Sequence, residues 1–402
     1  MKILMVLPRF NRRKWDFLTG QAWNLAQRMT AEGWAQAVIA AGREESEPAL
    51  EVVNNVPVYR FAPAAGSWRN FFQRRSDLDR GEADLPGLEI FLRKKEFDLV
   101  HIFAPGRLCQ KVCRIAGERG IRRVIFCRSE YFRNRDEFLQ RDSESDAGNA
   151  FHSYGNALKS AERILCGDHN LRRMLAARLG DRQLVHWQAG VDGSFFSKTS
   201  AVNFRKFYQL PEKRKLILSV GTVCESKNYE LLLDTALMLR QRANNFHLVI
   251  IGWTAQERYC NKLKRRIREL NLENTVTLIP GLPPGDECFR AAFRTASLVL
   301  LPSRYDVSAG AVLEAWAAGV PVIASPAGSG GELLEDNING RVLKLSEIQQ
   351  WVAACEEILN EKNRPQMEKM RIAGLEKVRS LNWTTRLEKL RTVYEEVIAE
   401  RV

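Results

Sequence analysis

Two acidic residues, Asp306 and Glu314, lie eight positions apart in the window LPSRYDVSAGAVLEAWAAGVPVIAS (301–325). A run of small residues (308–310) stands between them, where the pattern predicts that a helix begins. Small residues at a helix start let an anion approach free backbone amides, and the helix dipole favours negative charge there. Carboxylates on either side can accept hydrogen bonds from sugar and ribose hydroxyls. The window therefore suits a sugar joined to a diphosphate and a nucleoside.

Short apolar runs alternate with longer amphipathic segments and predict the elements around this window. Expected strands cover residues 2–8, 35–41, 97–103, 122–128, 163–167 and 183–190, then 215–221, 246–252, 275–281, 297–303 and 320–325, with helices at 21–32 and 230–240. Such alternation predicts an α/β protein with parallel sheets covered on both faces. The pattern restarts after residue 197, so we expect two similar doubly wound domains whose ligands bind at the carboxyl ends of the strands.

Composition and charge narrow the functional classes. Of the 402 residues, 45% are hydrophobic and 27% charged, which disfavours disordered, collagen-like and coiled-coil proteins. The 8 scattered cysteines form no CxxC pair, as in a reduced cytoplasmic protein. A net charge of +13 favours anionic partners, but without a nucleic-acid-binding signature we expect no nucleic acid. The opening MKILMVLP predicts a buried strand instead of a signal peptide.

The window 301–325 resembles the acidic motif of the retaining GT-B glycosyltransferases of family 4, also called glycosyl transferases group 1. Their frame reads P-S-x-x-E-x7-E-A-x-A-x-G-x-P-V, and this chain has Asp306 at the first glutamate. The likeness extends to segments 97–103, 190–196, 219–236, 331–343 and 382–398. It implies two Rossmann-like doubly wound domains that face each other across a cleft.

The resemblance also implies domain limits and residue roles. The acceptor-side domain would cover residues 1–197, the nucleotide-sugar domain 198–380, and a helix in 381–402 would return to the first domain. In catalysis, Asp306 would contact the transferred sugar, Lys227 would neutralise the leaving diphosphate, and His101 would act from the acceptor side. A hydrogen-bonded structural imidazole explains His101, at the end of an apolar strand, equally well. The donor would further be bound by Glu314 at its ribose and by Val307, Ser308, Ala309, Gly310, Gly221, Thr222, Gly252, Leu282 and Gly20. Such enzymes commonly use no metal, and we expect no cofactor apart from the donor substrate.

The implied reaction moves a sugar from a UDP- or GDP-sugar to a hydroxyl acceptor on a cell-surface glycan or lipid-linked saccharide. Thr222 stands at the family's arginine and Phe103 at a family histidine, so a non-catalytic GT-B binding or scaffold protein stays open. A basic nucleic-acid-binding protein is a third, weaker hypothesis. Asp77 and Asp79 imitate a D-x-D metal motif without its preceding strand, and we interpret them as coincidence.

The expected location is the cytoplasm, with a peripheral position at the inner face of the membrane as a variant. Segment 67–80 mixes aromatic residues with arginines, a composition that suits an anionic bilayer surface. A loop whose aromatic side chains pack on their own domain explains it equally well.

Overall fold

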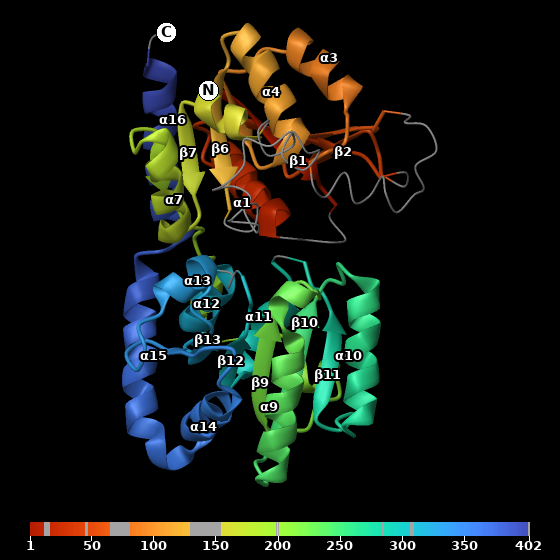
Figure 1. The fold of residues 1–402 in the computed structure, drawn as a ribbon, viewed down its shortest axis with the longest axis vertical. Helices are drawn as coiled ribbons and strands as arrows, with labels where there is room; N and C mark the ends of the chain where they lie inside the picture. Colours follow the sequence, from red (N-terminus) through yellow and green to blue (C-terminus); the bar gives the residue numbers. More distant parts are fainter. Residues whose placement is uncertain are drawn as a thin grey trace. The chain divides into compact units, whose positions relative to one another are not determined.

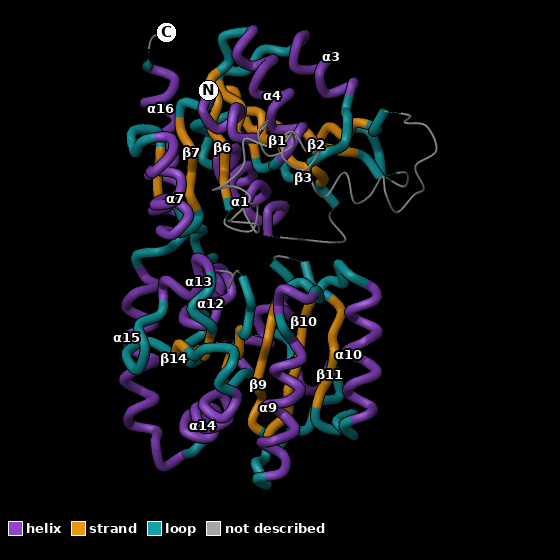
Figure 2. The backbone as a smooth tube through the Cα atoms, viewed as in Figure 1, coloured by secondary structure: helices purple, strands orange, loops and turns teal. Residues whose placement is uncertain are grey.

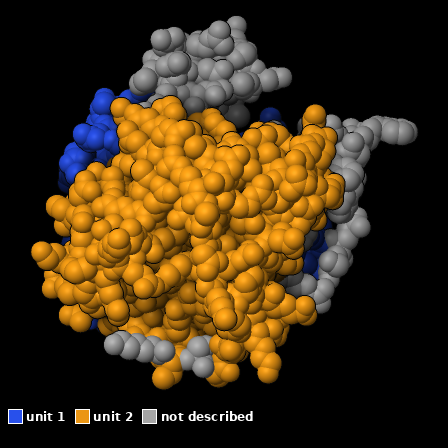
Figure 3. Space-filling view, turned by 90° about the horizontal axis from the view of Figure 1, so that it is seen from below, with its two compact units in different colours: residues 1–12, 17–187, 387–402 blue, residues 13–16, 188–386 orange. Residues whose placement is uncertain are grey.

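The computed structural model describes residues 1–11, 17–44, 47–64, 81–128, 154–197, 199, 201–283, 285–305 and 309–400. The chain divides into two compact units, one of residues 1–12, 17–187 and 387–402 and the other of residues 188–386 (Figure 3). The predicted limits at residues 197 and 380 differ somewhat from these limits. Segment 67–80, which includes Asp77 and Asp79, lies outside the described residues.

The first unit is built on an eight-stranded sheet with the order β3-β4-β2-β1-β5-β6-β7-β8 (Figure 1). Its strands are β1 (Lys2–Arg9), β2 (Gln36–Gly42), β3 (Leu50–Val53), β4 (Val56–Phe61), β5 (Leu99–Ile102), β6 (Arg122–Cys127), β7 (Arg163–Cys166) and β8 (Leu184–His186). Its helices are α1 (Phe17–Ala31), α3 (Pro86–Lys94), α4 (Gly106–Glu118), α7 (His169–Leu179) and most of α16 (Trp383–Ala399). The strands form because short, nearly continuous apolar runs can be covered on both faces of a parallel sheet.

A hairpin at the edge of this sheet was absent from the sequence prediction. Strands β3 and β4 pair antiparallel. Asn54 and Asn55 join them, with φ values of +45° and +64°. Two consecutive residues with positive φ define the tight turn that matches the twist of a hairpin, and asparagine tolerates this conformation. The Asn-Asn pair was therefore an available sequence signal.

The second unit contains a six-stranded parallel sheet with the order β11-β10-β9-β12-β13-β14 (Figure 2). Its strands are β9 (Lys215–Val220), β10 (Phe246–Gly252), β11 (Val276–Pro280), β12 (Leu298–Leu301), β13 (Val322–Ala324) and β14 (Arg341–Val342). Its helices are η2 (Gly193–Phe196), α8 (Phe204–Phe207), η3 (Glu225–Lys227), α9 (Tyr229–Gln241), α10 (Glu257–Glu269), α11 (Glu287–Thr295), α12 (Ala309–Ala317), α13 (Gly328–Leu333), α14 (Ile348–Leu359), η4 (Glu361–Asn363) and α15 (Arg364–Arg379).

Alternate residues of the central strand β9 enter two separate apolar clusters. Leu216 and Leu218 face one cluster, and Ile217 faces the other. Because successive side chains of a strand point to opposite faces, the sheet is covered by helices on both sides. Each predicted strand is present, which confirms the predicted doubly wound α/β architecture. Among the described helices, none combines the length and apolar character that a membrane crossing requires.

Candidate active site

The carboxyl ends of β9 and β12 bring the predicted donor-binding residues of the second unit to one place. These strands lie side by side, and the strand order runs outward from them in opposite directions. Ligands of open parallel sheets bind at such a point because the following loops diverge there. Gly221 directly follows β9, and the loop to α12 directly follows β12. The geometry therefore gathers the candidate residues at the place where this fold binds ligands.

Helix α12 follows the β12 loop and begins with the predicted small residues. Ala309 is buried and Gly310 is partly exposed at its first positions. The helix is anchored by Trp316, whose indole Nε1 donates to the carbonyl of Asn339 at 2.8 Å. Asp306, Val307 and Ser308 lie outside the described residues, so their roles stay predictions.

Glu314 lies further along the same helix in a poorly solvated environment. Burial raises the pKa of its carboxyl group to about 8, and the negative charge of Asp192 acts in the same direction. Among the described residues, the Glu314 carboxylate has no hydrogen-bond partner. Asp192, by contrast, accepts from the backbone N–H of Ser194 at 2.9 Å. The carboxyl group of Glu314 therefore keeps hydrogen-bonding capacity that hydroxyl groups of a ligand can use.

Lys227 lies on the short 3-10 turn η3, immediately after β9. Its Cε and Cδ atoms lie 3.6 and 3.7 Å from the position that a Cβ on Gly221 would occupy. Gly221 itself has a φ of +148°, a conformation that favours glycine. The hydroxyl of Tyr229 donates to the Gly221 carbonyl at 2.9 Å and fixes this backbone. The side chain of Lys227 is thus held over the carboxyl end of β9.

Gly252, the last residue of β10, is required by close backbone packing. A Cβ at this position would lie 1.9 Å from the carbonyl oxygen of Gly221. The two strands can therefore approach at this edge only with glycine at position 252. The need for glycine at position 252 is thus structural. The contact of Gly252 with the donor stays a prediction.

The remaining predicted donor-binding residues lie in different settings. Thr222 is partly exposed after β9, and Leu282 packs partly buried against the core of the second unit. Gly20, predicted to bind the donor, lies inside helix α1 of the first unit. A Cβ on Gly20 would meet no atom within 4 Å, so the described residues give no steric reason for glycine.

His101 lies in β5 of the first unit and is fully buried, with 0% of its surface exposed. Its Nδ1 lies 2.6 Å from the hydroxyl oxygen of Tyr394. Burial lowers the pKa of His101 to about 3, so the ring is neutral at ordinary pH. These surroundings suit a structural imidazole, and they do not suit a side chain that must reach a substrate.

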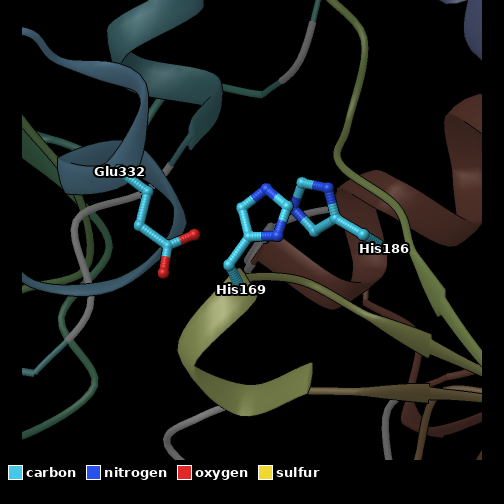
Figure 4. A group of neighbouring side chains, drawn as sticks. All are labelled: His169, His186 and Glu332. Atoms are coloured by element: carbon cyan, nitrogen blue, oxygen red, sulfur yellow. The ribbon is translucent and has the colours of Figure 1, made fainter. Parts of the chain in front are cut away.

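Two histidines that the sequence analysis overlooked stack at the carboxyl edge of the first sheet. His169 begins α7 and His186 ends β8 (Figure 4). Their ring centroids lie 3.7 Å apart with an interplanar angle of 27°. No short-range sequence pattern indicates this pair, because the two residues come from successive elements that meet only in the folded sheet.

Comparison with known proteins identifies the class of this site. Residues 201–376 match the family model described as "Glycosyl transferases group 1". Residues 201–376 form a glycosyl transferases group 1 domain. An uncharacterised glycosyltransferase of Methanocaldococcus jannaschii is 24% identical over 349 residues, which cover 85% of this chain and 84% of that protein. A GDP-mannose-dependent alpha-mannosyltransferase of Corynebacterium glutamicum is 25% identical over 55% of this chain and 49% of its own length.

A solved structure confirms the architecture of this glycosyltransferase. The HepE protein of Anabaena, solved with UDP-glucose, matches 98% of this chain and 100% of its own with a TM-score of 0.74 at 14% identity. The glycosyltransferase therefore has the GT-B fold that the sequence predicted. Lys227, Ala309, Gly310 and Glu314 lie within the matched domain, whereas His101 lies outside it.

Proposed function

We propose that this glycosyltransferase transfers a sugar, with retention of its anomeric configuration, from a UDP- or GDP-sugar to a hydroxyl acceptor. The observation that carries the proposal is Glu314, a poorly solvated carboxylate without a described partner on the helix that follows β12. Such a group is costly for the free protein, since burial disfavours its charged form. Ribose hydroxyls of a donor would supply the hydrogen bonds that it lacks.

The cationic side of the proposed site would act on the leaving group. Lys227, held over the end of β9, would stabilise the negative charge that develops on the leaving nucleoside diphosphate. Preorganised cations and amides at such a position lower the barrier because they need no reorganisation during the reaction. The amides at the start of α12 would face the phosphates, and Asp306 would contact the transferred sugar.

The names of similar proteins support the choice of donor class. One relative is named for its dependence on GDP-mannose, and one structural neighbour was solved with UDP-glucose. Both ligands are sugars joined to a nucleoside diphosphate, so both fit the same arrangement of cation, amides and carboxylate. The acceptor that we propose is a cell-surface glycan or a lipid-linked saccharide. We further propose a cytoplasmic enzyme that can associate with the inner face of the membrane.

The test has two steps on the full chain. A thermal-shift screen with UDP, GDP, ADP and their sugars finds the donor, because a ligand that binds only the folded state raises the melting temperature. Transfer from that donor is then measured for the wild type and for Glu314→Ala. Undiminished transfer by Glu314→Ala would show that the assigned site is wrong. An anomeric analysis of the product by NMR tests the retaining course.

A non-catalytic binding subunit is the second candidate. The burial of His101, together with the uncharged Thr222 and Phe103, motivates it, because these positions then supply no accessible catalytic group. Tight nucleotide binding without transfer or donor hydrolysis across a broad donor panel would favour this candidate.

A further inference from the structure

We propose that Arg304 binds the diphosphate of the donor together with Lys227, and that Asn228 is the residue that positions Arg304. The inference deepens the proposed function and rests on it. Arg304 lies in the loop that follows β12, whereas Lys227 and Asn228 follow β9. These two strands are the central pair at which the strand order of the sheet reverses.

Two hydrogen bonds attach Arg304 to the turn that carries Lys227. The backbone N–H of Arg304 donates to the carbonyl of Ser226 at 2.7 Å. Its guanidinium Nη2 donates to Oδ1 of Asn228 at 2.6 Å. Ser226 and Asn228 are the immediate neighbours of Lys227 in the chain, so the loop is fastened on both sides of that lysine. The fold thus places two cationic side chains on one small surface at the carboxyl edge of the sheet.

The side chain of Asn228 binds Arg304 instead of capping the following helix, which is the usual role of an asparagine at a helix start. It precedes α9 with a φ of +53° and a ψ of +44°, and its side chain caps no N–H of the helix. The N–H of Tyr229 instead donates to the hydroxyl of Tyr259 at 3.0 Å. The Asn228 side chain is buried, with 5% exposed, and its amide oxygen is directed to Arg304. Asparagine tolerates this left-handed backbone, so its side chain is free to contact Arg304 from this turn.

Several N–H groups of the Arg304 side chain remain available to bind a ligand. Among the described residues it forms no ion pair, and its Nε and Nη1 donate to no described acceptor. Arg294 of the same unit, by contrast, is paired with Glu287 at 2.8 Å. The Arg304 side chain is exposed, so an incoming ligand can reach it. A guanidinium fixed by one nitrogen presents its other N–H groups in the planar fork that suits phosphate oxygens.

The experiment compares ligands that differ only in the diphosphate. Binding of UDP, GDP and the corresponding nucleosides to the full chain is measured by calorimetry. Arg304→Gln should weaken the better nucleoside diphosphate about tenfold to a hundredfold, the range for a hydrogen bond to a charged group. Affinity for the nucleoside alone should not change. Arg304→Lys should be intermediate, because lysine keeps the charge and loses the fork.

Asn228→Gly tests the positioning role without adding strain at positive φ. It should weaken diphosphate binding in the wild type and have no further effect in Arg304→Gln, since the two residues act through one contact. Arg268→Gln, at an exposed arginine in the last turn of α10, is the matched control and should bind normally. Thermal unfolding of each variant shows whether it is folded.

The outcomes separate the two proposals. If the wild type binds no nucleoside diphosphate, the proposed function fails and this inference fails with it. If the wild type binds and Arg304→Gln binds equally well, the proposed function stands and Arg304 has no role. Equal weakening of nucleoside and diphosphate also overturns the inference, because it indicates a general distortion of the site.

Discussion

Nδ1 of His101 lies 2.6 Å from the hydroxyl oxygen of Tyr394, and this contact joins strand β5 to helix α16 within the first unit. Both side chains are buried. The ring of His101 also lies against that of Phe103, with centroids 4.1 Å apart. The contact therefore fastens the C-terminal helix to the centre of the first sheet, and we infer that His101 serves stability.

Replacing Tyr394 with phenylalanine tests this inference. The variant leaves a buried ring nitrogen of His101 without its partner, which costs about 1–3 kcal/mol of unfolding free energy. Denaturant unfolding measures this loss. Turnover per folded molecule should stay unchanged, and Tyr208→Phe, at a partly exposed tyrosine, should leave stability nearly unaltered. A turnover defect in a stable Tyr394→Phe variant would indicate that His101 takes part in catalysis.

Acid sensitivity gives an independent test of the same histidine. Burial lowers the pKa of His101 from its ordinary value of 6.5 to about 3. Below pH 6.5 this histidine is therefore protonated in the unfolded chain but not in the folded chain. The free energy of unfolding should thus fall as the pH drops toward 3. His101→Phe should flatten this part of the stability curve, measured by thermal unfolding between pH 6.5 and 4. An unchanged slope would mean that other groups control acid unfolding.

The sequence predicted the strands well, because buried parallel strands such as β1 and β10 appear as continuous apolar runs. The hairpin of β3 and β4 was missed because Leu50 and Val52 are apolar but exposed. The edge strand therefore lacks the alternation of buried apolar and exposed polar residues by which a strand is predicted. The buried side chain of His101 contacts Tyr394, 293 positions away, and no local pattern reports such a contact. Likewise, the pKa of Glu314 is raised first by burial and then by the negative charge of Asp192, and only the fold produces both.

Glu314→Gln should weaken donor binding by roughly tenfold to a hundredfold, because it replaces charge-assisted hydrogen bonds to ribose hydroxyls with neutral ones. Calorimetric titration with the donor found by the thermal-shift screen measures the change. Glu273→Gln removes an exposed carboxylate elsewhere in the second unit and is the matched control. Equal affinities for the wild type and Glu314→Gln would remove Glu314 from the binding site.

The raised pKa of Glu314 also predicts a pH dependence of binding. With a pKa of about 8, the free protein is mostly protonated at this group at pH 7. Hydroxyl donors of a bound ribose favour the charged form, so the donor should displace a proton and bind more tightly as the pH rises from 7 to 9. Calorimetry in buffers of different ionisation enthalpy detects the released proton. Glu314→Gln should abolish both effects.

The same group should cost stability in the free protein. The pKa of Glu314 in the folded protein lies above its ordinary value of 4.5, so the unfolded state loses its proton first as the pH rises. The stability of the wild type should therefore fall relative to Glu314→Gln between about pH 4.5 and 8, then stay parallel to it. Melting temperatures of the two proteins from pH 5 to 9 provide the comparison. A constant difference over this range would contradict the raised pKa.

Two glycine substitutions should act in opposite directions on stability. A Cβ at Gly252 would lie 1.9 Å from the Gly221 carbonyl oxygen, so Gly252→Ala must separate β9 from β10 and should cost about 1–3 kcal/mol or more. Gly20→Ala adds a Cβ in open space within α1 and should stabilise the protein by about 0.5–1 kcal/mol. Denaturant unfolding measures both. If Gly252→Ala were as stable as the wild type, the close approach of β9 and β10 at Gly221 would be contradicted. The position of Lys227 above Gly221 depends on the same backbone and would then be in question as well.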